Sequence, residues 1–167
     1  MFSLIFPGQG SQTVGMGKEL YDKFPYIKEL FNSADDILGY SISKIIFDGP
    51  KEDLDLTENT QPAIFLVGYS IVEMLKKESD IKLDSAKYFA GHSLGEYTAL
   101  ASSGSLEFKN AIKLLNDRGK AMQNATPKGT GGMIAVLGAE INEINELLEK
   151  NQKEHKCYIA NDNSNGQ

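Results

Sequence analysis

Residues 86–102 read Ala-Lys-Tyr-Phe-Ala-Gly-His-Ser-Leu-Gly-Glu-Tyr-Thr-Ala-Leu-Ala-Ser, and this stretch decides the fold. Its G-x-S-x-G motif at 91–95 follows a strand-like apolar run and leads into a helix-like run at 94–102. A serine on a tight strand-to-helix turn presents its hydroxyl at the positive end of a helix, near backbone N–H groups. Flanking glycines permit the strained backbone and leave room for a substrate. We therefore predict a nucleophile elbow with Ser93 as the nucleophile; the alternative is a glycine-rich turn without catalytic role.

Composition narrows the classes of protein to which the chain can belong. Its 167 residues, 41% of them hydrophobic, suffice for one domain or for a domain plus part of a second. A net charge of −6, with lysines and glutamates interspersed, argues against a nucleic-acid surface. No apolar run approaches the roughly 20 residues that span a bilayer. The N-terminal Met1–Phe6 lacks a basic region and predicts a first strand instead of a signal peptide, so we expect a cytoplasmic protein.

The single cysteine, Cys157, cannot form an internal disulfide. It also has no Cys or His partner at metal-ligand spacing, so we expect no metal site. The simplest expectation is a small residue in a buried strand.

The pattern of apolar residues predicts alternating strands and helices along the chain. We expect Pro25 to break the first helical stretch, and Thr60 to be a possible N-cap of the long helix that follows the turn-like segment 49–53. On the predicted helix 108–123, Leu115 and Met122 belong to the apolar face that we expect to pack in the core. The predicted strands are 3–6, 86–90, 133–137 and 157–160, and the predicted helices are 18–38, 62–77, 94–102, 108–123 and 141–150.

Pro127 and the glycine-rich run at 129–132 form the best candidate hinge in the sequence. Beyond it, two short strands and one helix are hard to stabilise alone, so we expect the fold of this chain to be incomplete.

The loop after the first strand, Pro-Gly-Gln-Gly-Ser-Gln at 7–12, resembles a nucleotide cradle but fits neither fingerprint. The pattern G-x-G-x-x-G would need glycine at Thr13, and a Walker motif would need glycine at Gln12 and Ser or Thr at Glu19. Its backbone N–H groups remain available to another anion.

Arg118 is the only arginine among seventeen basic residues. A guanidinium matches a carboxylate with two parallel hydrogen bonds, which an ammonium cannot do. We therefore interpret Arg118 as a candidate carboxylate-binding residue, against the alternative of an ordinary surface arginine. Gln61 lies at a predicted helix start, from which it could point into a site, although a solvated side chain is the simplest expectation from its position alone.

A general base for Ser93 is not evident, although a serine nucleophile normally needs a histidine within hydrogen-bond reach. His92 precedes the nucleophile directly, and its side chain should diverge from Ser93 on a tight turn. His155 lies in a polar turn, where a solvated surface histidine is expected.

Six segments, in order along the chain, resemble malonyl-CoA:acyl carrier protein transacylases. They are Phe6–Gln12, Thr60–Ala63, Gly91–Tyr97, Arg118, Gly132–Gly138 and Ala160–Gln167. The resemblance implies an α/β fold with an α/β-hydrolase-like large subdomain and an inserted ferredoxin-like small subdomain. Residues 1–127 would form the N-terminal part of the first and 128–167 the start of the second, both incomplete in this chain.

The resemblance also implies a role in fatty-acid synthesis and an activity. Ser93 would take the malonyl group from malonyl-CoA as an ester and pass it to the phosphopantetheine thiol of acyl carrier protein. The backbone N–H groups of Gln9 and Leu94 would form the oxyanion hole, Arg118 would bind the malonyl carboxylate, and Gln61 would lie beside the substrate. Malonyl-CoA and acyl carrier protein would be the partners, with no bound cofactor and no metal.

The chain departs from the family at its C-terminus, since the family's base histidine lies downstream of the segment resembling 160–167. We therefore expect residues 1–167 alone to be nearly inactive and poorly stable. Two alternatives stay open: a related acyltransferase or esterase with another acyl group, and a non-catalytic truncated chain that only binds partners.

Overall fold

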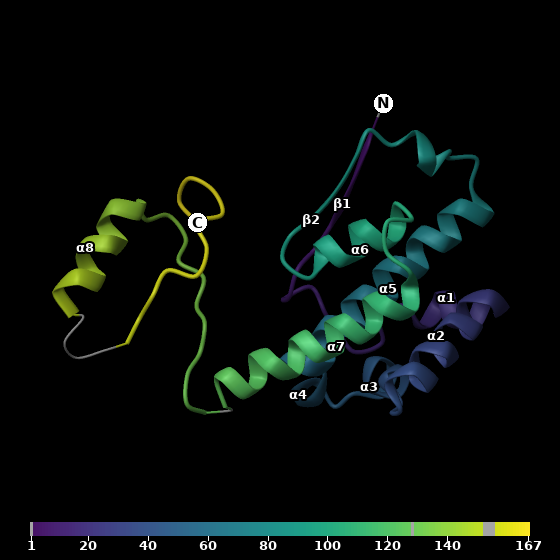
Figure 1. Cartoon of the computed structure of the whole chain (residues 1–167), viewed down its shortest axis with the longest axis horizontal. Helices are drawn as coiled ribbons and strands as arrows, with labels where there is room; N and C mark the ends of the chain where they lie inside the picture. The colour runs from purple at the N-terminus through teal and green to yellow at the C-terminus, as the bar shows by residue number, and fades with distance from the viewer. Residues whose placement is uncertain (1, 128, 152–155) are drawn as a thin grey trace. The chain divides into compact units, whose positions relative to one another are not determined.

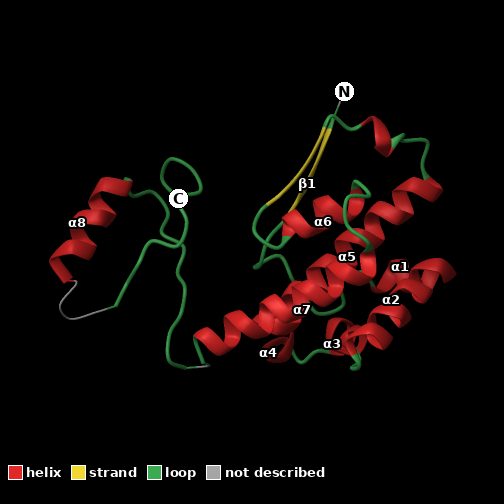
Figure 2. Ribbon diagram, in the orientation of Figure 1, coloured by secondary structure: helices red, strands yellow, loops and turns green. Residues whose placement is uncertain are grey.

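The computed structural model describes residues 2–127, 129–151 and 156–167, which contain many helices and one pair of short strands (Figure 2). The chain divides into two compact units, Met1–Lys128 and Gly129–Gln167. The elements in order (Figure 1) are β1 (Ser3–Phe6), α1 (Lys18–Lys23), α2 (Pro25–Leu38), α3 (Ile42–Asp48), α4 (Lys51–Leu54), α5 (Thr57–Glu78), the 3-10 helix η1 (Leu83–Ser85), β2 (Tyr88–Gly91), α6 (Gly95–Ser102), α7 (Phe108–Ala125) and α8 (Ile141–Asn151).

The two strands of the first unit pair in parallel, with Ser3 opposite Tyr88 and Phe6 opposite Gly91. Parallel strands need a long crossover, which the helices between residues 18 and 85 supply. Helix α6 packs against both strands. A small core of Phe6, Val72, Leu83 and Ala99, with the partly buried Phe89 packed against it, joins the sheet to α5 and α6.

The main core lies among α2, α5 and α7, which bury apolar side chains such as Phe31, Phe65 and Leu115. Helices α5 and α7 lie side by side (Figure 1) and share the most extensive contact between any two described elements. Gly119 permits this approach, because a Cβ there would lie 2.6 Å from the Glu58 Cα. The close packing brings the N-terminal part of α5 against the C-terminal half of α7.

Most predicted elements of the first unit are confirmed. The first strand covers the predicted residues, and the strand before the motif begins two residues later than expected, at Tyr88. Pro25 separates α1 from α2 and occupies the first helical position, where its missing N–H costs nothing. Helices α6, α7 and α8 fall within two residues of their predicted bounds.

The start of α5 was wrongly predicted. The helix begins at Thr57 with Leu56 as its N-cap, and Pro62 lies inside it. Thr60 is not the cap: its hydroxyl donates to the Leu54 carbonyl oxygen at 2.6 Å. Burial of the surrounding apolar residues outweighs the missing Pro62 N–H, so tertiary packing extends the helix past the local signal. Segments 42–48 and 51–54 also fold as short helices, and the latter was expected to be a turn.

In the second unit, α8 is confirmed, but the strands predicted at 133–137 and 157–160 are wrong. Both segments lack regular structure, and Ile134 and Tyr158 are exposed. Cys157 is likewise exposed and not buried in a strand. An apolar run forms a strand only where another strand accepts its hydrogen bonds, which a sequence pattern does not reveal. His155 lies outside the described residues.

Candidate active site

Ser93 lies on a sharp turn between β2 and α6, and its side chain is exposed. Its backbone φ of 54° is in the left-handed region, and among the described non-glycine residues only Ser93 has a positive φ. The motif glycines make the turn possible. A Cβ on Gly91 would lie 2.0 Å from the Gly95 carbonyl carbon, and one on Gly95 would lie 2.5 Å from the Phe6 carbonyl oxygen. Strain of this kind costs about 1–3 kcal/mol and clusters at functional sites.

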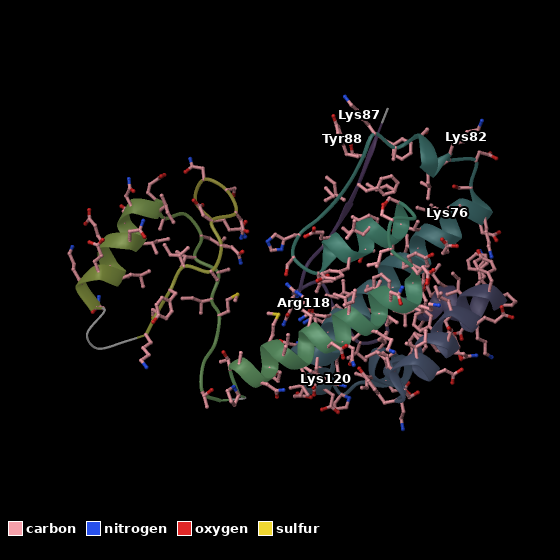
Figure 3. All side chains as sticks on the ribbon, viewed as in Figure 1. Lys76, Lys82, Lys87, Tyr88, Arg118 and Lys120 are labelled. Atoms are coloured by element: carbon pink, nitrogen blue, oxygen red, sulfur yellow. The ribbon has the colours of Figure 1, made fainter. Side chains whose placement is uncertain are left out.

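Arg118 reaches from α7 to this turn (Figure 3). Its Nη2 donates to the Ser93 Oγ at 3.0 Å, and its Nη1 donates to the Gln61 Oε1. Its side chain is partly buried between α7 and α5. The guanidinium of Arg118 therefore joins Gln61 to Ser93, two residues that are distant from it and from each other in the sequence.

Gln61 is completely buried, so the expectation of a solvated side chain is wrong. The reason is that α5 starts four residues earlier than Gln61 and α7 covers that face. The Gln61 amide nitrogen donates to the Met122 Sδ at 3.3 Å. Sequence reasoning assigned Met122 only to the core; its spacing of four from Arg118, which places both on one helix face, was the signal that could have found it.

The loop at 7–12 lies directly against the motif. The His92 N–H donates to the Phe6 carbonyl oxygen at 3.1 Å, and a Cβ on Gly8 would lie 2.7 Å from the His92 Nδ1. Two side chains of the loop bind the segment between the end of α4 and the start of α5. Gln9 donates to the Thr57 hydroxyl at 3.3 Å, and Gln12 donates to Asp55, which follows α4, at 2.8 Å.

The carboxylate of Asp55, which binds Gln12 of this loop, is held in its charged form. Hydrogen bonds from Lys51 and then Gln12 keep the pKa of Asp55 below its usual value. Gln12 also accepts from the Gly10 N–H at 2.8 Å, so one side chain connects the loop backbone to this carboxylate.

Two backbone donors, Gln9 on the loop at 7–12 and Leu94 at the turn, were predicted to form an oxyanion hole. In residues 2–127, neither the Gln9 N–H nor the Leu94 N–H donates to a backbone carbonyl. The Leu94 side chain is buried under the turn. Donors of this kind stabilise an oxyanion when they are fixed in advance. The oxyanion-hole role itself stays a prediction.

Arg118 cannot act as the base for Ser93, because a guanidinium only donates hydrogen bonds and stays charged. His92 is exposed, and its ring lies beside Gly8 on the loop. The arrangement around Ser93 therefore supplies a hydroxyl and a cationic fork, which suits capture of a substrate that carries a carboxylate.

Within the described ranges, no three His, Cys, Asp or Glu side chains are arranged to hold a metal ion. No helix in those ranges is both long and apolar enough to cross a bilayer.

Comparisons with known proteins identify relatives over nearly the whole chain. The family described as the acyl transferase domain matches residues 3–165. The malonyl CoA-acyl carrier protein transacylase of Bacillus subtilis (strain 168) is 43% identical over 166 residues, covering 99% of this chain and 51% of the relative. The chain thus spans about half the length of the curated relatives it matches. These matches confirm the resemblance drawn from the motifs.

Solved structures agree with the sequence matches. The malonyl CoA-acyl carrier protein transacylase of Clostridium perfringens has a TM-score of 0.84 at 40% identity, covering 99% of this chain and 51% of that one. A malonyl-transacylase solved in complex with its holo type II PKS acyl-carrier protein has a TM-score of 0.78 at 39% identity, covering 89% of this chain and 47% of that one. The chain therefore has the α/β acyl transferase fold.

Proposed function

The chain belongs to the acyl transferase domain family, and from this we propose that the complete protein moves a malonyl group from coenzyme A to acyl carrier protein in fatty-acid biosynthesis. The observation that carries the proposal is the Arg118 guanidinium, which joins Gln61 to the hydroxyl of Ser93. A nucleophile within hydrogen-bond reach of a cationic fork is arranged for an acyl group that ends in a carboxylate.

In the first half-reaction, the Ser93 Oγ attacks the thioester carbonyl of malonyl-CoA. The new C–O bond forms as the C–S bond breaks, coenzyme A leaves as the thiol, and the malonyl group stays on Ser93 as an ester. The N–H groups of Gln9 and Leu94 would hold the oxyanion meanwhile. We propose that the base taking the serine proton is the family's histidine, supplied by the half of the protein that this chain does not cover.

In the second half-reaction, the phosphopantetheine thiol of acyl carrier protein attacks the ester and regenerates the Ser93 hydroxyl. The two half-reactions together give ping-pong kinetics. Support for this partner comes from the related transacylase that was solved with its acyl-carrier protein.

Arg118 accounts for the choice of a malonyl group. A partly buried guanidinium is costly without an acceptor, and a terminal carboxylate offers two. An acetyl or other neutral acyl group would leave Arg118 with only Gln61 and Ser93. The position of Arg118 therefore favours malonyl transfer over a general esterase, whose neutral substrates do not pair with the cation.

The finer architecture belongs to the same proposal. The parallel strands and the tight turn at Ser93 support an α/β-hydrolase-like large subdomain with a nucleophile elbow, beginning with residues 1–127. Residues 128–167 would begin the ferredoxin-like small subdomain. These bounds are nearly those of the second compact unit, Gly129–Gln167. Malonyl-CoA and coenzyme A are substrate and product, no bound cofactor or metal is needed, and a cytoplasmic location stays a prediction.

A transfer assay tests the proposal. The chain would be produced together with the second half of the Bacillus subtilis relative and given malonyl-CoA with holo acyl carrier protein. We expect malonyl-acyl carrier protein to form, and the Ser93→Ala variant to be inactive. Equal transfer by the variant would overturn the role of Ser93. Binding of acyl carrier protein without any transfer would favour the non-catalytic alternative, and a preference for acetyl-CoA would favour an acyltransferase for another group.

A further inference from the structure

We infer that Met122 is a positioning residue, whose thioether sets the orientation of the Gln61 amide and thereby aims Arg118 at Ser93. The inference rests on the proposed function, in which Arg118 holds the substrate carboxylate. It starts from three consecutive contacts: Met122 Sδ accepts from Gln61, Gln61 accepts from Arg118, and Arg118 donates to Ser93.

The two neighbours of the Gln61 amide have opposite hydrogen-bonding character. A thioether sulfur only accepts hydrogen bonds, and a guanidinium only donates them. With its NH₂ toward Met122 and its carbonyl toward Arg118, the amide satisfies both neighbours. Turned over, it would place two donors face to face on one side and two acceptors on the other. The sulfur and the guanidinium together therefore select one of the two amide orientations.

The orientation of the Gln61 amide is important because the residue is buried. Gln61 is fully buried, so no bulk water replaces a lost partner of its amide. The Met122 side chain as a whole is 42% exposed, so it is not simply a core residue whose removal would collapse the packing. Without the sulfur, the buried NH₂ would lack the acceptor that now holds it, and the amide would shift or rotate to find another. The carbonyl would then leave the Arg118 Nη1.

Arg118 depends on that carbonyl for its direction. The Gln61 Oε1 holds one arm of the guanidinium, and the other arm points to the Ser93 Oγ, where the malonyl group would be attached. Losing one anchor frees the guanidinium to adopt several directions. Binding of a carboxylate would then first require the guanidinium to be ordered again, which weakens it.

The test uses the chain combined with the second half of the Bacillus subtilis relative, with ¹⁵N-labelled glutamine side chains in this chain and free malonate as the ligand. Met122→Leu keeps the volume and removes the acceptor, while Met122→Gln returns an acceptor on an unbranched side chain. Met74→Leu is the matched control, since Met74 is a partly buried methionine on α5 that packs against the core. Two quantities are measured: hydrogen exchange of the Gln61 side-chain amide, and the affinity for malonate.

We expect Met122→Leu to speed Gln61 amide exchange and to weaken malonate binding by about fivefold each, with Met122→Gln near wild type and Met74→Leu unchanged. Unchanged exchange in Met122→Leu, or equal effects in Met122→Leu and Met74→Leu, would overturn the inference. If the wild-type chain binds malonate no better than Arg118→Ala, the proposed role of Arg118 fails, and the exchange rates alone still decide whether Met122 holds Gln61.

Discussion

At the scale of single residues, the site combines a strained backbone with a shared cation. Ser93 has a φ of 54°, a conformation that glycine adopts without the cost paid by residues with a Cβ. The same turn exposes the hydroxyl to the Arg118 Nη2. A serine at this position therefore carries a backbone cost that a glycine would not carry.

The strain at position 93 is measurable. Ser93→Ala and Ser93→Gly both remove the hydroxyl and its bond to Arg118, but only glycine also relieves the positive φ. We expect Ser93→Gly to be more stable than Ser93→Ala by about 0.5–1 kcal/mol, despite the larger unfolded-state entropy of glycine. Urea denaturation of the two variants measures the difference. An alanine variant as stable as the glycine variant, or more so, would show that the turn is unstrained.

Arg118→Lys tests the fork. An ammonium cannot reach Gln61, Ser93 and a carboxylate with the planar geometry of a guanidinium. Loss of a charge-assisted hydrogen bond lowers a rate or a binding constant by about 10- to 100-fold. We therefore expect the rate of malonyl transfer to fall by that factor while the rate of acetyl transfer stays constant. The exposed Lys120 on the same helix gives the control Lys120→Ala, which should transfer malonyl normally. Equal losses for both acyl groups would point to a structural defect instead.

Sequence reasoning reached Ser93 and Arg118 because each has a local signal: one is in a motif, and the other is the single arginine of the chain. It failed for the environment of Gln61, since burial there comes from α7, more than fifty residues away. It also missed Met122, because a methionine on an apolar helix face looks like core until its neighbours are known.

At the scale of elements, the crossing of α5 and α7 positions the site. Gly119 follows Arg118 on α7, and a Cβ there would lie 2.6 Å from the Glu58 Cα and 2.7 Å from the Thr57 carbonyl oxygen. Both neighbours are backbone atoms, which have little freedom to move away. The distance between the two helices at this point therefore depends on glycine.

Gly119→Ala should separate the helices. Alanine favours a helix over glycine by about 1 kcal/mol, but overpacking costs about 1–3 kcal/mol, and here the added atom meets backbone on two sides. We expect a net destabilisation of about 1–2 kcal/mol by urea denaturation, with weaker malonate binding as the adjacent Arg118 moves. Gly132→Ala is the matched control, because a Cβ at Gly132 meets nothing within 4 Å. A stabilised Gly119→Ala would contradict this account of the crossing.

Tyr40 links the loop before α3 to α7, through a hydrogen bond from its hydroxyl to the Asn116 Oδ1 at 3.2 Å. Burial, and then the nearby Glu58 and Asp35, raise the pKa of Tyr40 from 10 to about 12. Because the folded-state pKa is raised, its contribution to stability is full below pH 10 and is lost as the pH rises toward 12. We expect Tyr40→Phe to lose less stability than wild type between pH 10 and 12. Identical alkaline losses in a pH series of urea denaturations would contradict this.

The elements that sequence patterns predicted best are those with a clear start or stop. Pro25 marks the break between α1 and α2, and the glycines around Ser93 separate β2 from α6. Patterns failed where distant packing decides. The start of α5 is set by burial across Pro62, and the segment 133–137 has strand-like residues without a strand to pair with.

At the scale of the whole molecule, the described residues bring the candidate site together, but their β-sheet is small. Two strands form it, and Ile5 and Tyr88 on those strands are 79% and 59% exposed. A two-stranded sheet is marginal without further strands or covering helices. The relatives are about twice as long as this chain. The hinge predicted at 127–132 coincides with the change between the two compact units.

The most direct test of the central claim is the mass of the Ser93 peptide after exposure to malonyl-CoA without acyl carrier protein. The chain would again be combined with the second half of the Bacillus subtilis relative, so that the ester accumulates and has no acceptor. We predict a mass increase of one malonyl group on the peptide that contains Ser93, with no increase in the Ser93→Ala variant. A malonyl group on any other residue would contradict the account. So would the absence of a malonyl group on Ser93 in a preparation that, in a separate assay, loads acyl carrier protein.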